Sequence, residues 1–160
     1  MRQHRALATL RAGGVTSGPG MVLDSPSMAE LFAQVGFEWA WMDWQHGQWT
    51  ESTINNAIAR FLATETAPIV RVKGQEPGTI NRVLDMGAMG IVAAFVETAE
   101  QAEIGARACR YPPEGTRGYC QSRCAAYGFK AAEYREQINE QVVFIPMIES
   151  AQAVENIDEI

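Results

Sequence analysis

An acid and an imidazole follow a short apolar run in the first third of the sequence. Residues 39–42 are Trp, Ala, Trp and Met, and Asp43 and His46 come after them, separated by Trp44 and Gln45. Such a run is typical of a strand buried in a parallel sheet, which would place both polar side chains at its carboxyl end. We expect the Asp43 carboxylate to orient the His46 ring, an arrangement that suits a general base near neutral pH. On these two residues alone, a hydrogen-bonded histidine at the start of a loop is an equally good interpretation.

Two more polar residues stand at the ends of later apolar runs. Arg71 lies near the end of the β-branched run 68–72, and Glu149 follows the last predicted strand. Because the carboxyl ends of parallel strands share one edge of a sheet, we expect His46, Arg71 and Glu149 to converge there. The structural alternatives are an ion pair between Arg71 and an acid such as Asp85, and a surface salt bridge for Glu149.

Alternating strand and helix signals position these residues. Strands are predicted at 21–23, 39–43, 68–72, 91–96 and 142–148, and helices from Ser27, Thr50, Pro77, Thr98, Ala131 and Ser150. The first of these helices has the Ser-x-x-Glu capping spacing, an apolar face of Met28, Leu31, Phe32 and Val35, and Gly36 as its end. Strands alternating with helices through short connections predict a parallel sheet built from right-handed crossovers.

One long connection interrupts this alternation. Residues 110–118 contain two prolines and two glycines, so they form neither a helix nor a central strand. Long loops in compact domains are often functional or mobile. Arg117 in this loop is a candidate ligand for a substrate carboxylate, although a solvated arginine is the better interpretation.

Composition narrows the class of protein. The 160 residues are 47% hydrophobic and 20% charged, which is typical of one soluble globular domain. A net charge of −6 argues against a nucleic acid or an anionic membrane as partner. No apolar stretch is long enough for a transmembrane helix or a signal peptide, so we expect a cytoplasmic protein.

Cysteine spacing and glycine motifs exclude further classes. The three cysteines, Cys109, Cys120 and Cys124, include no Cys-x-x-Cys pair and have no neighbouring histidine. We therefore expect reduced thiols, with neither a disulfide framework nor a zinc site. Neither glycine-rich nucleotide-binding motif is present, so no nucleotide cofactor is expected.

A set of ordered motifs resembles the HpcH/HpaI family of class II pyruvate aldolases, which are (β/α)8 barrels. The matching segments are residues 36–39 leading into Asp43-x-x-His46, 68–72, 82–88, 110–118, and 148–149 before 153–156. The resemblance implies reversible cleavage of a 4-hydroxy-2-oxo acid to pyruvate and an aldehyde, through an enolate stabilised by Mg²⁺, Mn²⁺ or Co²⁺. It also implies a homo-oligomer, a trimer or hexamer when the protein is full-length.

The resemblance assigns a role to each candidate residue. Glu149 corresponds to a metal ligand, and Arg71 to the group that holds the carbonyl or enolate oxygen of pyruvate. His46, supported by Asp43, corresponds to the base that handles the proton of the substrate hydroxyl. Asp85 corresponds to an acid that helps to position this network, with a purely structural acid as the alternative. Trp44 and Trp49 are candidates for the wall of the aldehyde pocket, with core or interface packing as the better interpretation.

Three positions depart from the family pattern, and one family residue lies outside the sequence. Gln45 stands where the family commonly has Glu, Met147 where it commonly has Gln, and Cys120 where Gly is frequent. The second metal carboxylate of the family belongs to a segment after Ile160. A closed barrel of this kind takes about 250 residues, so we expect residues 1–160 to form one incomplete barrel domain containing roughly the first five β/α units.

Two rival functions stay open at this point. One is a truncated, non-catalytic barrel fragment that is completed by or bound to another chain through an open sheet edge. The other is a citrate-lyase-like or macrophomate-synthase-like relative, which would use the same enolate chemistry with another electrophile.

Overall fold

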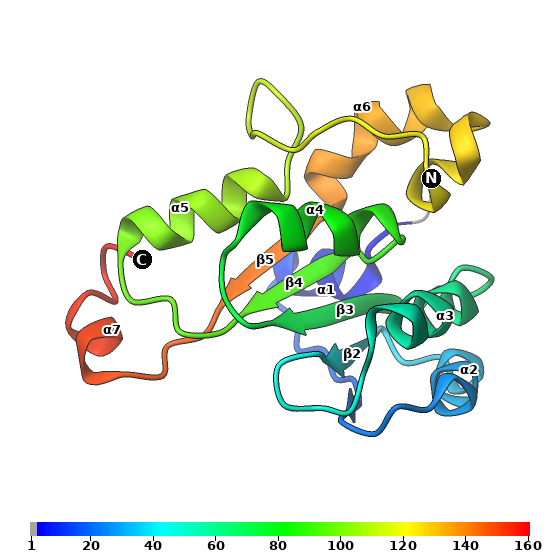
Figure 1. Ribbon diagram of the computed structural model, residues 1–160, viewed down its shortest axis with the longest axis horizontal. Coiled ribbons are helices and arrows are strands. Elements are labelled where there is room, and N and C mark those ends of the chain that lie inside the picture. Colours follow the sequence, from blue (N-terminus) through cyan, green and yellow to red (C-terminus); the bar gives the residue numbers. More distant parts are fainter. Residues whose placement is uncertain (1–2) are drawn as a thin grey trace.

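Five parallel strands form the centre of the molecule in the computed structural model, which describes residues 3–160. The strands are β1 (Gly20–Met21), β2 (Trp39–Asp43), β3 (Ala67–Val72), β4 (Gly90–Ala93) and β5 (Val143–Pro146). Their order in the sheet is their order in the chain, and every neighbouring pair is parallel. The labelled strands all point the same way in Figure 1, so their carboxyl ends share one edge. This is the arrangement of consecutive units in a (β/α)8 barrel.

Helices connect the strands and begin where the local sequence caps them. The helices are α1 (Arg5–Arg11), α2 (Pro26–Val35), α3 (Glu51–Phe61), α4 (Pro77–Asp85), α5 (Ala99–Ala108), α6 (Ala131–Gln141) and α7 (Ala151–Glu155), with a 3₁₀ segment η1 (Arg123–Gly128) before α6. Thr50, Thr98 and Ser150 accept hydrogen bonds from the third amide of their helices, which satisfies backbone donors that otherwise have no partner. Glu76 does the same for α4, whose first residue is the predicted proline.

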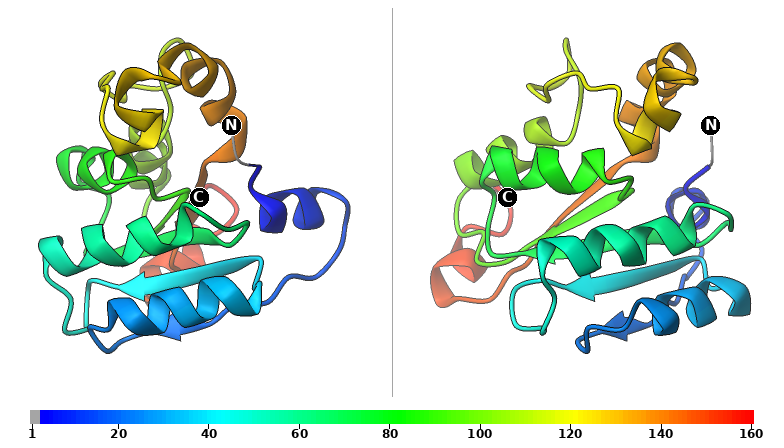
Figure 2. Two further views of the ribbon diagram at one scale, coloured as in Figure 1. Left: turned by 90° about the vertical axis from the view of Figure 1, so that its right-hand side faces the viewer. Right: turned by 45° about the vertical axis from the view of Figure 1, so that its right-hand side comes forward.

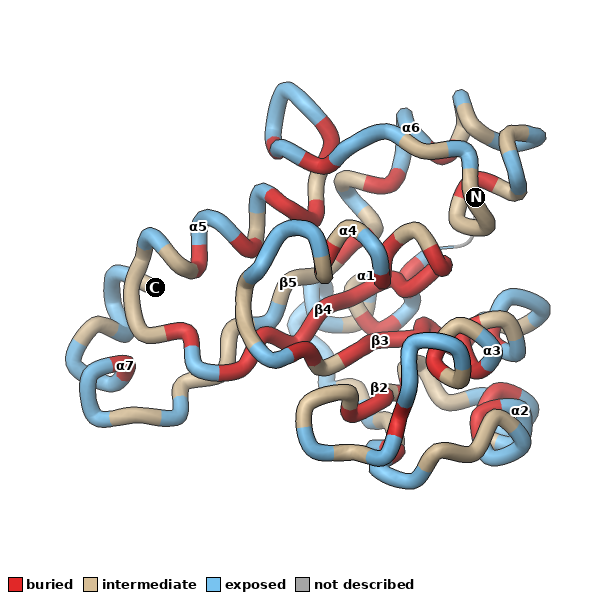
Figure 3. The backbone as a smooth tube through the Cα atoms, viewed as in Figure 1, coloured by how far each residue is buried: buried red, intermediate tan, exposed pale blue. Residues whose placement is uncertain are grey.

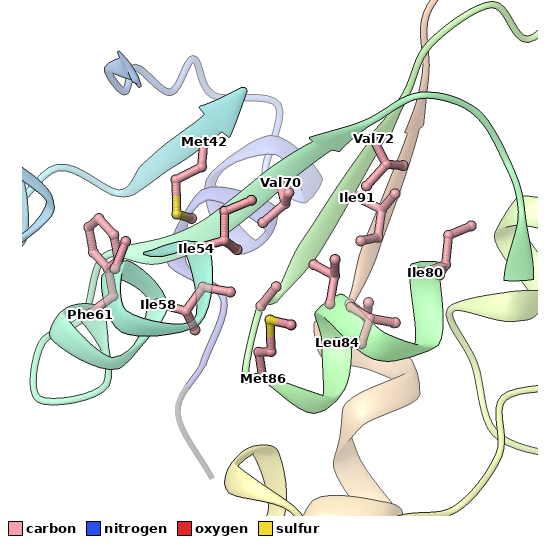
Figure 4. Close-up of a cluster of buried hydrophobic side chains, with 14 of the residues drawn as sticks. Met42, Ile54, Ile58, Phe61, Val70, Val72, Ile80, Leu84, Met86 and Ile91 are labelled. Atoms are coloured by element: carbon pink, nitrogen blue, oxygen red, sulfur yellow. The ribbon is translucent and has the colours of Figure 1, made fainter. Parts of the chain in front are cut away.

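The hydrophobic core lies between the sheet and the helices on its outer face. Alternate strand residues such as Met42, Val70 and Ile91 point to this face and are fully buried. Ile58 of α3 and Leu84 of α4 meet them from the helix layer, as Figure 4 shows. Side chains of this size each contribute about 1.5–3 kcal/mol when they are fully buried, so this layer holds the strand ends in place.

The opposite face of the sheet is covered by α1. Leu7 and Leu10 of this helix line a cavity of about 290 Å³ together with Trp39, Trp41 and Ile69 from the strands. Figure 2 shows α1 on the far side of the sheet from α3 and α4, and Figure 3 shows the concentration of buried residues in the strands. The inner face of the sheet therefore carries its own apolar contacts.

Several boundaries differ from the sequence-based prediction. Ser25 caps α2, not Ser27, and the helix buries Ala29 and Ala33 while Leu31 and Val35 stay exposed. Of the predicted face, Phe32 packs against the core, but Met28, Leu31 and Val35 do not, because small residues let α2 pack closely and the pattern of large apolar residues does not detect them. Helix α1 was not predicted. β4 ends at Ala93, before the predicted residue 96.

No helix among residues 3–160 is long and apolar enough to cross a membrane.

Candidate active site

An ion pair joins the ends of β2 and β3. Asp43 and Arg71 are register partners in the parallel ladder, so their side chains start side by side. Arg71 Nε donates to Asp43 Oδ1 at 2.8 Å and Nη2 donates to Oδ2, which makes a bidentate pair. The ring of Trp41 lies 4.9 Å from the guanidinium carbon and forms a cation–π contact. The Arg71 side chain is 13% exposed and that of Asp43 3%, so the guanidinium is held in one geometry at the rim of the sheet.

The partners of Asp43 differ from those that the sequence led us to expect. Its Oδ1 accepts hydrogen bonds from the backbone amides of Gln45 and His46, each at 3.1 Å. The His46 side chain is exposed, and its ring makes no hydrogen bond within the described part of the chain. The prediction that Asp43 orients the His46 ring was therefore wrong. The carboxylate fixes the loop backbone under His46 and holds Arg71, because the strand register brings the guanidinium to it first.

Electrostatics keep this pair ionised. Burial favours the neutral form of Asp43, but the hydrogen bonds from Arg71 and from the His46 amide lower the pKa of the carboxyl below its ordinary value. The hydrogen bond with Asp43 raises the pKa of Arg71; burial opposes this effect, and the negative charge of Glu149 adds to it. Arg71 Nη1 makes no hydrogen bond to any of residues 3–160, so both of its N–H donors are open.

Glu149 enters the same region from the end of β5. Its Oε2 accepts a hydrogen bond of 3.1 Å from the backbone amide of Phe95, just after β4. Phe95 has a φ of 54°, a conformation that costs a non-glycine residue about 1–3 kcal/mol and that often marks functional sites. Glu149 is exposed and its Oε1 makes no hydrogen bond within residues 3–160. Arg71 and Glu149 thus lie at the ends of β3 and β5, with β4 between them, and interact electrostatically.

A cavity of about 420 Å³ adjoins the loop that follows Asp43. Its lining comes from the loops after β2 and β3 and from the first turn of α4, and includes Trp44, Gln45, Trp49, Lys73 and Thr79. The Oε1 atom of Gln45 is buried without a hydrogen-bond partner. Lys73 forms no ion pair with any residue that the structure describes. The cavity therefore offers aromatic walls, a cation and an open acceptor.

Asp85 is not brought to this group. It is the last residue of α4, which runs back from the carboxyl edge of the sheet, so about 13 Å of helix separates it from the Arg71 end. Its carboxylate accepts a hydrogen bond of 2.9 Å from Arg117 Nη2. Among residues 3–160, Asp85 makes no hydrogen bond or ion pair with Asp43 or Arg71, contrary to the prediction that it helps to position their network.

Arg117 contradicts the prediction of a solvated loop arginine. The residue is 2% exposed, and the guanidinium carbon lies 4.8 Å from the ring of Tyr111 and 5.6 Å from that of Tyr134. Its partners come from three separate elements, so no local pattern indicates its burial. The Asp43–Arg71 pair, by contrast, could have been predicted from the sequence. Each residue is the last of the inward-facing side chains of its strand, and the two strands are consecutive.

Comparison with known proteins identifies relatives over almost the whole chain. The family model described as HpcH/HpaI aldolase/citrate lyase matches residues 21–160. A 4-hydroxy-2-oxovalerate aldolase from Novosphingobium aromaticivorans is 41% identical over 157 residues, which cover 96% of this chain and 58% of that protein. A 5-keto-4-deoxy-D-glucarate aldolase from Escherichia coli (strain K12) is 37% identical over 153 residues, covering 96% of this chain and 60% of that protein.

Solved structures agree with the fold. An HpcH/HpaI aldolase/citrate lyase family protein from Burkholderia cenocepacia J2315 matches with a TM-score of 0.89 and 30% identity, covering 98% of this chain and 64% of that one. Macrophomate synthase matches with a TM-score of 0.81 and 27% identity, covering 98% and 56%. The predicted fold class is confirmed, and the chain spans about three fifths of the length of the relatives it matches.

Proposed function

Because the chain belongs to the HpcH/HpaI aldolase/citrate lyase family, we propose that it acts as a class II pyruvate aldolase. The reaction is the reversible cleavage of a 4-hydroxy-2-oxo acid to pyruvate and an aldehyde. The observation that carries this proposal is the Arg71 guanidinium, fixed by Asp43, with the Nη1 donors open and Glu149 at the same edge of the sheet, one strand further on. The aldolase names of the relatives support the same reaction class.

Glu149 fits a hard divalent cation such as Mg²⁺, Mn²⁺ or Co²⁺. Its exposed carboxylate has one oxygen fixed by the Phe95 amide and the other without a hydrogen bond among residues 3–160. Ions of this class are often held by one or two carboxylates, with water and substrate oxygens as the remaining ligands. Bound there, the cation would supply positive charge that stabilises an enolate oxygen.

Arg71 and His46 would divide the remaining chemistry between them. We propose that His46 removes the proton from the C4 hydroxyl of the substrate, after which the C3–C4 bond breaks and releases the aldehyde. The electron pair of that bond passes to the pyruvate enolate. The enolate oxygen accepts a hydrogen bond from the open Nη1–H of Arg71. Protonation at C3 then gives pyruvate. Asp43 acts through Arg71 as a positioning residue.

The cavity beside Trp44 and Trp49 is proposed as the aldehyde site. Lys73 favours an aldehyde that carries a carboxylate, since the cation has no partner among the described residues. The Oε1 atom of Gln45 favours an aldehyde that also carries a hydroxyl group. A buried acceptor without a donor costs free energy, and the hydroxyl group would donate to it. We propose a hydroxylated, anionic aldehyde as the preferred substrate.

Exchange of the methyl protons of pyruvate with deuterium tests the proposal without requiring the correct aldehyde. With Mn²⁺ present, proton NMR should show exchange by the unaltered chain, and Arg71→Lys should slow it by about 100-fold or more, the usual loss when an enolate-stabilising donor is removed. Glu149→Gln should abolish the dependence on Mn²⁺. Arg82→Lys, which alters only an exposed pair with Glu51, should leave the rate unchanged.

Failure has a definite form. A folded chain that exchanges no faster than its Glu149→Gln variant refutes the assignment and leaves the non-catalytic barrel fragment as the explanation. The family similarities do not favour that alternative.

We also propose a cytoplasmic homo-oligomer with small-molecule partners, and with neither nucleic acid nor membrane as a partner. Three free thiols suit a reducing compartment, and Tyr127 and Phe129 expose 67% and 93% of their surface on the segment around η1. Light scattering coupled to size exclusion should show a trimer or a hexamer, and Phe129→Ser should weaken it. A monomer at micromolar concentration would refute the oligomer.

A further inference from the structure

Two cysteines and an acid meet at the far end of α4 from the Arg71 region. Cys120 precedes η1, Cys124 lies in its first turn, and Asp85 ends α4. One ligand atom from each residue, two sulfurs and one carboxylate oxygen, lies within 4.8 Å of the other two. We call this group the Asp85–Cys120–Cys124 cluster. None of its members has a contact with the Asp43–Arg71 pair.

The separation of the two sulfurs suits a shared tetrahedral ion. The Sγ atoms lie 3.6 Å apart. Two thiolates on one tetrahedral Zn²⁺, each at about 2.3 Å, are separated by about 3.8 Å. Small movements of two side chains would therefore bring both sulfurs and the carboxylate oxygen onto one ion, with a water molecule as the fourth ligand.

Charge balance at the cluster favours a divalent cation. Two thiolates and one carboxylate carry three negative charges, which one divalent ion and one guanidinium neutralise. Arg117 provides that guanidinium: its side chain is fully buried, and its Nη2 lies 2.9 Å from Asp85 Oδ1 and 3.8 Å from Cys124 Sγ. A buried cation that is already in place lowers the cost of gathering three anionic ligands.

A hydroxyl group holds the backbone of the acid in place. Ser122 Oγ donates to the backbone carbonyl of Asp85 at 2.7 Å and lies 3.3 Å from Cys120 Sγ and 3.6 Å from Cys124 Sγ. This hydrogen bond fixes Asp85 beside the segment that carries the two cysteines, as contacts outside the ligand atoms do in metal sites. Cys124 also lines a cavity of about 380 Å³, which gives an ion a path to the cluster.

We propose that the Asp85–Cys120–Cys124 cluster is a Zn²⁺ site. Thiolates select soft ions, so this site would discriminate against the Mg²⁺ or Mn²⁺ proposed for Glu149. Bound zinc would tie the end of α4 to η1 and to the loop before it, and would add stability to this long connection between α5 and α6.

Cobalt binding to the reduced, metal-free chain tests the proposal. Titration with Co²⁺ should produce a sulfur-to-cobalt charge-transfer absorption that saturates at one ion per chain, is removed by Zn²⁺ and is insensitive to Mg²⁺. Cys120→Ser and Cys124→Ser should each abolish the band and weaken Zn²⁺ affinity by about 100-fold or more, because each removes one of three protein ligands.

Two control variants make the result specific. Cys109→Ser removes the fully buried thiol outside the cluster and should keep the band. Glu149→Gln should also keep it, so failure here is separable from failure of the aldolase proposal. The inference is overturned if no charge-transfer band appears, if Cys120→Ser leaves Zn²⁺ affinity unchanged, or if the two cysteines only form a disulfide under mild oxidation.

Discussion

Replacing Asp43 and Arg71 separately and together would measure how strongly the pair holds the edge of the sheet. Asp43 accepts two hydrogen bonds from Arg71 and two from backbone amides, and both side chains are largely buried. Removing one member of such a pair leaves the other charge without compensation and costs about 3–5 kcal/mol. The free energy of unfolding of a domain is typically about 5–15 kcal/mol, so Asp43→Ala should remove a large part of it.

The double-mutant cycle separates the pair from its surroundings. Asp43→Ala, Arg71→Ala and the double variant should give a coupling free energy of about 2–3 kcal/mol, at the upper end for residues in contact. Urea unfolding followed by tryptophan fluorescence is suitable, because Trp41 lies against the guanidinium.

A matched cycle on an exposed pair provides the control. Arg82 and Glu51 have a similar Nε–O distance of 2.8 Å, but their side chains are 60% and 50% exposed. Their coupling should be about 0.5 kcal/mol or less, since solvent screens exposed charges. Equal couplings in the two cycles would refute the reasoning that burial and backbone hydrogen bonds make the Asp43–Arg71 pair strong.

Three other predictions concern pH, packing and specificity. Folding lowers the pKa of Asp43, so the contribution of its carboxylate to the free energy of unfolding is complete above about pH 4 and is lost as pH falls through the lowered value. Asp43→Asn should therefore flatten the acid side of a stability–pH curve measured by urea unfolding. Gly105→Ala places a methyl carbon 2.2 Å from Phe144 Cζ and should cost about 1–3 kcal/mol in a urea titration, whereas Gly118→Ala, with nothing within 4 Å, should be nearly neutral; equal effects would contradict the packing argument. Lys73→Met should raise KM for carboxylate-bearing aldehydes by about tenfold and leave that for acetaldehyde unchanged; an equal change for both would exclude Lys73 from the aldehyde site.

Helices with a cap and a wide apolar stripe were predictable from the sequence. Thr50 before Ile54 and Ile58, and Pro77 before Ile80 and Leu84, contain both signals within one stretch of chain, and the structure confirms them. Helix α1 has seven residues, and its apolar face consists of only Ala6, Leu7 and Leu10, which is too short a pattern to predict a helix. Its position depends on contacts with α6 that no local pattern encodes.

The candidate site also has a part that was predictable from the sequence and a part that was not. The position of Arg71 and Glu149 at the edge of the sheet was predictable, because a polar residue that ends an apolar strand is a local signal. The partners of Asp43 depend on strand register, and the burial of Arg117 depends on Tyr111 of its own loop and on Tyr134 of α6. The approach of Asp85 to Cys120 is likewise a tertiary contact, and for that reason cysteine spacing alone led us to expect no zinc site.

The attachment of α1 to α6 has a consequence for synthesis on the ribosome. The amide of His4 donates to Gln141 Oε1 across a sequence separation of 137 residues, and Arg11 pairs with Glu140. At about 5–20 residues per second, translation delivers these acceptors roughly 7–27 s after the first helix. During that interval Leu7 and Leu10 have no completed surface to cover, so the nascent chain would present them to chaperones, and the amino-terminal helix would be among the last parts to settle.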